Sequence, residues 1–376
     1  MSKSQIATGG IADDAVTTAK TSYSTSPFRN LIINGDMSIA QRATSKASVN
    51  TSQYTSVDRF EFGVGNTFAT FTTSQDTDSP NEFSYSAKLD CTTSGSIGSG
   101  GYLRIRQKIE GQFLQSLAFG TSDAKTITVS FYIKSNQTGN FVINFRNFNS
   151  SQTRIANKIV AINSANTWEY KSVTVSGDTV RSIDNTNGDE FDLEFWFNGG
   201  SSYSSGTTSA SFIDQPGDNY FSGGTLTIGG STDDYVNLTG VQLEVGTSAS
   251  DFEFLPFDVN LQRCQRYYQT TSDWENGKYL GVTSNRAEMG TKFSNNLSSS
   301  DRNAEGFAFN TMRTTPTVTF YGDSSTTSGQ VRLQGSYVSA SGGDLNNRNC
   351  AYVNVTSGSV SAVVDVAYAY NLDAEL

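Results

Sequence analysis

The sequence predicts an all-β protein built from sandwiches, and two observations predict it. The first is composition: the 376 residues include 34 Gly, 24 Phe and 17 Tyr but only 5 Pro. Glycine supplies the positive φ angles of tight turns, and aromatic side chains fit a pleated, half-buried surface. The second is an apolar period of two, which is typical of strands that bury one face.

Three segments show the alternation in chain order: residues 126–134 (TITVSFYIK), 140–148 (NFVINFRNF) and 191–198 (FDLEFWFN). In the first, Ile127, Val129, Phe131 and Ile133 share one face, and in the last Phe191, Leu193, Phe195 and Phe197 do so. Two sheets that each bury one such face form a sandwich. A long stretch rich in Ser, Gly and Thr, residues 199–230, interrupts the pattern and predicts a functional or mobile loop.

The chain divides into three predicted parts. Residues 1–28 carry Ile6, Ile11 and Val16 five positions apart in polar surroundings, too few for a core in one copy but enough for three copies side by side. They predict an N-terminal attachment and trimerisation segment, with a disordered tail as the alternative. Residues 29–256 predict the main sandwich. Residues 257–376 predict a C-terminal β domain, entered through a short amphipathic helix at 260–269.

Charge and composition exclude several partners. The formal net charge is −10 and only 16% of residues are charged, so we expect no binding to nucleic acid or to anionic lipid. No segment approaches the roughly 18 apolar residues of a membrane span, which predicts no membrane insertion. Histidine is absent, which removes the usual catalytic base near neutral pH.

Three motifs, taken in order, resemble one family. They are residues 31–37 (LIINGDM), 54–60 (YTSVDRF) and 241–246 (VQLEVG). Together they resemble bacteriophage tail-fibre and related virion proteins, whose main body is a jelly roll similar to carbohydrate-binding modules. The resemblance covers residues 30–256, and the ending NLDAEL resembles the C-terminal domain of the same proteins.

The resemblance implies a fold, a location and partners. It implies a jelly-roll β-sandwich followed by a smaller sandwich-like C-terminal domain, with a short extended N-terminal stalk. The protein is expected to be a homotrimeric tail fibre on the virion exterior, made in the host cytoplasm. Its expected partners are host surface glycan and, through the N-terminus, other tail or capsid proteins. A capsid or tail decoration protein without a receptor role is an alternative.

Candidate glycan-binding residues come from the polar sides of the strands. Tyr132, Arg146, Asp192, Glu194 and Trp196 would form one face of aromatic rings among charges if they lie on one sheet. Such a face suits sugars, since their C–H faces stack on rings and their hydroxyls bond to polar groups. Trp196 is expected to point away from the core and to be exposed. The alternative is that this face packs on a neighbouring subunit or meets solvent.

The candidate residues for catalysis and for metal binding are all carboxylates. Asp192 and Glu194 share a strand face and could reach the separation of about 5 to 9 Å that glycosidases use, so a polysaccharide depolymerase is the alternative function. The prediction is nevertheless no enzyme activity and no catalytic residue. No cofactor is expected apart from calcium, for which Asp36 and Asp233 are the candidate ligands.

Overall fold

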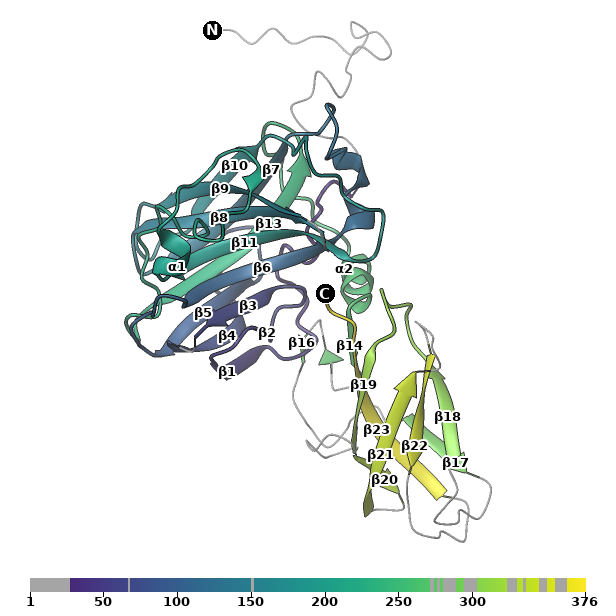
Figure 1. Ribbon diagram of the computed structural model, residues 1–376. Helices are drawn as coiled ribbons and strands as arrows, with labels where there is room; N and C mark the ends of the chain where they lie inside the picture. Colours follow the sequence, from purple (N-terminus) through teal and green to yellow (C-terminus); the bar gives the residue numbers. More distant parts are fainter. Residues whose placement is uncertain are drawn as a thin grey trace, which may run out of the picture.

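A computed structural model describes residues 28–66, 68–149, 152–270, 274–275, 278–279, 289–293, 303–322, 330–333, 336–344, 350–355 and 364–376. The predicted attachment residues Ile6, Ile11 and Val16 therefore lie outside the described residues. The fold is almost entirely antiparallel β structure, and its two large sheets stack as a jelly-roll sandwich (Figure 1). The predicted fold class is confirmed.

One layer of the sandwich is a six-stranded sheet. Its strands, in spatial order, are β1 (Ser45–Val49), β4 (Thr70–Asp76), β5 (Ser86–Thr93), β13 (Tyr235–Val245), β7 (Ile127–Ser135) and β10 (Glu169–Val175). The pairing of β13 with β7 slips between Thr239 and Gln242. Gly240 lies in this slip with φ of +61°, a backbone angle that glycine adopts without strain.

The other layer is a seven-stranded sheet. Its strands are β12 (Ile213–Asp214), β9 (Thr153–Ile162), β8 (Gly139–Phe148), β11 (Asp189–Gly199), β6 (Tyr102–Glu110), β3 (Glu61–Gly65) and β2 (Gln53–Tyr54). Strands β7 and β8 are consecutive in the chain but belong to opposite sheets, so the chain passes from one sheet to the other between Ser135 and Gly139.

The core lies between the two sheets, where the sequence alternation places it. The apolar residues that alternate along β7 and β11 are all buried. Phe131 of β7 packs edge to face against Phe195 of β11 in the opposite sheet, with ring centroids 5.1 Å apart. Phe141 of β8 contacts Phe131 in the same way at 6.0 Å. The alternating pattern therefore identified the inward faces of these strands correctly.

Within the part of the chain that the structure describes, helices are few and short. Two 3-10 turns, η2 (Gly111–Phe113) and η3 (Gln115–Leu117), follow β6, and α1 (Ser201–Ser204) follows β11. The helix predicted at 260–269 is α2 (Phe257–Gln265), which begins directly after Pro256. It ends before Tyr268 because β14 (Tyr268–Thr270) pairs with the last strand, β23 (Val364–Asp373). Tertiary pairing here overrides the helical spacing.

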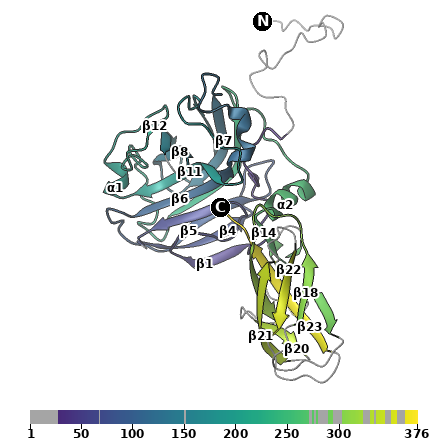
Figure 2. The ribbon, with the colours of Figure 1, turned by 45° about the vertical axis from the view of Figure 1, so that its right-hand side comes forward.

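The C-terminal part is a second antiparallel assembly around β23 (Figure 2). Besides β14 and β23, its strands are β17 (Met289–Phe293), β18 (Asn303–Ala308), β19 (Thr317–Gly322), β20 (Gln330–Leu333), β21 (Ser336–Asp344) and β22 (Cys350–Val355). The short strands β15 (Trp274–Glu275) and β16 (Lys278–Tyr279) pair with each other in a separate two-stranded sheet. The strands β19 and β23 lie side by side in this assembly. Both pair with each other over six residues.

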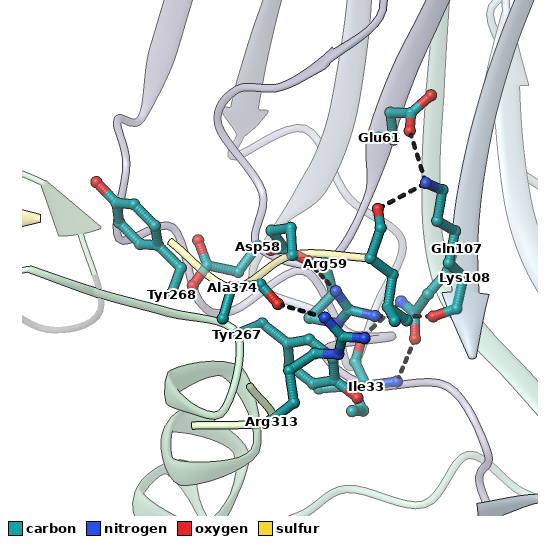
Figure 3. Close-up of polar contacts among 12 residues, drawn as sticks. Ile33, Asp58, Arg59, Glu61, Gln107, Lys108, Tyr267, Tyr268, Arg313 and Ala374 are labelled. Atoms are coloured by element: carbon teal, nitrogen blue, oxygen red, sulfur yellow. Dashed lines mark hydrogen bonds and ion pairs between the residues drawn. The ribbon is translucent and has the colours of Figure 1, made fainter. Parts of the chain in front are cut away.

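A polar junction joins this assembly to the jelly roll (Figure 3). The Arg59 side chain forms an ion pair with Glu375 and lies over the Tyr267 ring, 3.4 Å from the guanidinium carbon to the ring centroid. Lys108 of β6 donates a hydrogen bond to the Leu376 carbonyl at 2.6 Å, and Arg313 donates to the Ala374 carbonyl at 3.2 Å. The residues after β23 therefore contact the jelly roll directly.

Arg42 also contributes to the junction. Arg42 lies over the Tyr268 ring at 3.8 Å and forms an ion pair with Asp373 at 3.1 Å. Nearby, the Asp58 carboxylate accepts hydrogen bonds from both the backbone and the side chain of Gln41. Burial raises the pKa of Asp58 to about 6, although Arg42 and Gln41 act in the opposite direction.

Candidate functional site

The structure divides the predicted glycan-binding residues between two sheets. Arg146, Asp192, Glu194 and Trp196 lie on β8 and β11 of the seven-stranded sheet, whereas Tyr132 lies on β7 of the six-stranded sheet. The expectation of one shared face is therefore wrong for Tyr132. The reason is the crossing between β7 and β8, which the alternation pattern does not reveal.

On the seven-stranded sheet, the charged residues form an internal network. Asp192 accepts from Arg146 at 2.7 Å and from Arg106 at 3.1 Å, and Glu194 accepts from Arg104 at 2.9 Å. Arg106 also pairs with Glu61 of β3 at 2.9 Å. Three guanidinium groups thus face three carboxylates across four adjacent strands.

The pKa values of this network follow from burial and pairing. The Asp192 and Glu194 side chains are fully buried. Burial raises the pKa of Asp192, against the effect of Arg106 and Arg146. Burial also acts upward on Glu194, but Arg104, Arg146, Arg106 and a hydrogen bond from Trp196 together hold the pKa of Glu194 below its usual value. Glu194 is therefore a structural anion.

Trp196 points away from the sandwich core, as alternation predicts, but it is only 1% exposed. Its ring is stacked on Tyr220, with centroids 4.9 Å apart and planes inclined by 17°, and it contacts Tyr203 at 5.2 Å. The indole N–H donates to Glu194 at 2.7 Å. The expectation of an exposed Trp196 is wrong because residues 199–230 fold back over this face.

The covering segment also forms hydrogen bonds with amide side chains of the sheet beneath it. The Asn144 side chain donates to the Tyr220 carbonyl at 3.0 Å, and Asn157 donates to Asn144 at 2.7 Å. Val142, Ile155 and Phe221 join Trp196 and Tyr220 in a small apolar cluster, separate from the main core. The long insertion is thus a cover for the sheet, and Asp192 and Glu194 beneath it do not meet solvent.

The calcium candidates are not close to one another. The Asp36 carboxylate accepts from Ser38 at 3.0 Å and from Asn260 of α2 at 3.1 Å, and burial raises the pKa of Asp36. Gly35 pairs with Val241 in mid-β13, whereas Asp233 precedes that strand, a separation on the order of 20 Å along the strand. Among the described residues, no group of three His, Cys, Asp or Glu side chains could hold a metal ion.

The outer face of the six-stranded sheet presents a groove of about 580 Å³. Tyr132 of β7 and Tyr170 of β10 lie directly opposite each other in the register, with ring centroids 5.1 Å apart. The Tyr170 side chain is half exposed. The groove is lined by Glu82, Phe83, Ser130, Tyr132, Tyr170, Gly240, Ala249, Ser250, Asp251, Phe252 and Phe254. It combines aromatic rings with polar groups that face water.

The Tyr132 hydroxyl of this groove stays protonated at neutral pH. Burial, together with the neighbouring Tyr170 and Glu82, raises the pKa of Tyr132 above its ordinary value. A protonated phenol both donates and accepts hydrogen bonds. The pair therefore offers two ring faces and two hydroxyls to a ligand that carries hydroxyl groups.

Further aromatic residues continue along the same face. Trp168 precedes β10 and donates from its indole N–H to Asp78 at 3.0 Å, and Lys134 of β7 pairs with the same carboxylate at 2.7 Å. Burial acts upward on Asp78, but Lys134 and Trp168 lower its pKa overall. Tyr235 lies at the start of β13 with Lys88 over its ring at 5.4 Å. These residues extend the polar and aromatic surface beyond the groove.

The sequence identified only Tyr132 in this groove. Tyr170 could have been found from the alternation of residues 169–175, which places it on the polar side of its strand. Phe252 and Phe254 carried no such signal, because they follow the last strand of the sandwich in an irregular segment.

No family model matches the chain, and no curated protein matches it. Among solved structures, the chain is similar to the enzymatically active domain of tailspike protein 4 of bacteriophage CBA120, at 12% identity and a TM-score of 0.29. That match covers 58% of this chain and 22% of the tailspike chain.

Two carbohydrate-binding modules are also similar. TmCBM61, solved in complex with β-1,4-galactotriose, matches at 8% identity and a TM-score of 0.27, over 58% of this chain and 99% of the module. The family 11 module from Clostridium thermocellum, in complex with a β-1,3-1,4-mixed-linked tetrasaccharide, matches at 10% identity and a TM-score of 0.27, over 55% of this chain and 98% of the module.

Proposed function

We propose that this chain binds glycan without cleaving it, and that the groove on the six-stranded sheet is the binding site. The observation that carries the proposal is the pair Tyr132 and Tyr170, whose rings and hydroxyls line an open groove of about 580 Å³. A sugar ring can stack on such rings while its hydroxyls bond to the phenols and to the neighbouring carboxylates. The volume falls in the range of about 300 to 1,000 Å³ typical of small-ligand sites.

The groove replaces the site expected from the sequence. Trp196, Asp192 and Glu194 are buried under residues 199–230, so a glycan could contact them only if the cover moved. The same burial counts against the depolymerase alternative, because the two carboxylates are paired with arginines and cannot reach a polymer. Non-catalytic binding therefore remains our proposal.

The wider role is a proposal that rests on sequence motifs. The resemblance of residues 31–37, 54–60 and 241–246 to phage virion proteins favours an exterior component of a phage particle, attached through residues 1–28 as a trimer. Among the described residues, no helix has the length and apolar character needed to cross a membrane. A decoration protein without a receptor role would share the sandwich but would have no need of an open aromatic groove.

The test is a glycan array probed with the intact protein and with Tyr170→Ala and Tyr132→Ala. We expect loss of one stacking ring to weaken binding by about tenfold, since aromatic platforms contribute roughly 1 to 2 kcal/mol. Phe113→Ala is the matched control, because this ring is also exposed but lies outside the groove. Equal binding by all four proteins, or shortening of the bound polymer on incubation, would contradict the proposal.

A further inference from the structure

The groove has a second half made of phenylalanine. Phe83, Phe252 and Phe254 contact one another with ring centroids 5.1, 5.2 and 4.8 Å apart. Phe83 also meets Tyr132 at 5.6 Å, so the two halves are continuous. Phe254 is 50% exposed, although it carries no polar atom that would benefit from water. These three residues are called the phenylalanine notch below.

The notch suits a small apolar group better than a sugar ring. Its rings are inclined to one another by 41° to 73°, so they do not present one flat platform for stacking. A sugar hydroxyl placed against them would lose its hydrogen bond to water and find no replacement. A methyl group placed there would instead gain by leaving water.

Carboxylates flank the notch in sequence and in the groove. Glu82 precedes Phe83, Asp251 precedes Phe252, and both acids line the same groove. No described residue donates a hydrogen bond or forms an ion pair with either carboxylate group. Ionised carboxylates only accept hydrogen bonds. The edge of the notch therefore favours a ligand that donates an N–H or O–H next to its apolar group.

Gly240 provides the space for this arrangement. A Cβ atom at this position would lie 2.8 Å from the Phe83 ring and 3.1 Å from the Tyr132 ring. The slip of β13 thus places a residue without a side chain under the point where the tyrosine and phenylalanine halves meet. A ligand can span both halves because nothing projects between them.

We infer that the groove recognises N-acetylhexosamine units of a glycan. An acetamido group carries a methyl and an N–H donor side by side on a pyranose ring, which matches the notch, the carboxylates and the tyrosine pair. The methyl enters the notch, the amide N–H donates to Glu82 or Asp251, and the ring stacks on Tyr132 or Tyr170. This inference rests on the proposed glycan-binding function and names its ligand class.

Matched sugars test the inference. Saturation-transfer NMR with the full chain would compare N-acetylglucosamine and N-acetylgalactosamine with glucose, galactose, glucosamine and galactosamine. We expect the strongest transfer at the acetyl methyl and at least about fourfold tighter binding than for glucose and galactose, the parent sugars, which is the value of one buried methyl group. Equal affinity for N-acetyl and parent sugars, or no transfer to the methyl, would overturn the inference.

Two variants separate the inference from the proposed function. Phe254→Ala should remove most of the preference for N-acetyl sugars and leave parent sugars unaffected, and its half-exposed position should keep the fold intact. Tyr170→Ala should weaken both kinds of sugar alike. If Tyr170→Ala acts as expected but Phe254→Ala weakens both sugars equally, the notch does not read the acetamido group, and glycan binding by the groove still holds. If neither variant changes binding, both proposals fail.

Discussion

Replacing Trp196 by alanine should strongly destabilise the jelly roll. The side chain is 1% exposed, is stacked on Tyr220 and donates its indole N–H to Glu194. Truncating a buried tryptophan to alanine costs about 3 to 5 kcal/mol in the free energy of unfolding. Loss of the N–H also leaves one Glu194 oxygen without a described donor, although Arg104 still pairs with the other oxygen.

Two further variants help to interpret this loss of stability: one separates the hydrogen bond from the ring packing, and the other is a control. Trp196→Phe keeps an aromatic ring beside Tyr220 but removes the N–H, so it should cost about 1 to 3 kcal/mol, the range for a hydrogen bond to a charged group. Tyr170→Ala is the control on the uncovered sheet; its half-exposed side chain should change stability by no more than about 1 kcal/mol.

Urea unfolding followed by far-ultraviolet circular dichroism measures these differences without relying on tryptophan fluorescence. The decisive comparison is between Trp196→Ala and Tyr170→Ala. If Trp196→Ala lowers the free energy of unfolding by less than about 1 kcal/mol, residues 199–230 do not cover the ring, and the sheet face over β11 again becomes a candidate ligand surface.

Three other predictions concern the junction and the assembly. The raised pKa of Asp58 means that the folded state holds a proton on this carboxyl more tightly than the unfolded state, so the contribution of Asp58 to stability is full below about pH 4 and is lost as pH rises through about 6. Asp58→Asn should remove about 1 to 3 kcal/mol of the pH dependence of the free energy of unfolding, measured by urea titrations at several pH values. Identical pH profiles for the two proteins would refute this. Glu375→Gln should lower the free energy of unfolding by about 3 to 5 kcal/mol, because it leaves the buried Arg59 guanidinium without its ion-pair partner. The same variant should make the junction sensitive to limited proteolysis. Unchanged cleavage would mean that other contacts stabilise the junction. Multi-angle light scattering of the full chain should give about three times the 40.6 kDa mass of one copy, and a monomer at high concentration would contradict the trimeric stalk.

The inward faces of the strands were predictable because they depend on local alternation. In residues 191–198, every second residue is Phe or Leu, and all four of these side chains are buried between the sheets. The outward direction of Trp196 followed from the same rule. Its burial did not follow, because it depends on which distant segment folds over the face. Residues 199–230 carry Tyr203 and Tyr220, but nothing in their local pattern shows where these rings pack.

The groove on the six-stranded sheet was less predictable because four separate segments supply its aromatic rings. Tyr132 and Tyr170 meet through cross-strand register, which depends on how β7 pairs with β10. Phe83 comes from the connection between β4 and β5, and Phe252 and Phe254 come from the segment after β13. No window of the sequence contains all four segments, so composition and spacing could suggest a candidate glycan surface but not its location.

The outward faces of the two sheets carry similar residues, and what covers each face decides its role. Both present aromatic rings among charges, but the seven-stranded sheet has charges on adjacent strands that pair with one another, as with Arg146 and Asp192. Paired charges can be buried at tolerable cost only when each one has partners, and the insertion then excludes water from them. In the groove on the six-stranded sheet, the Glu82 and Asp251 carboxylates come from connecting segments and have no such partner in the described chain, so they are in contact with water or ligand. Binding is therefore expected where the charges are unpaired and the rings exposed, which is the groove at Tyr132 and Tyr170.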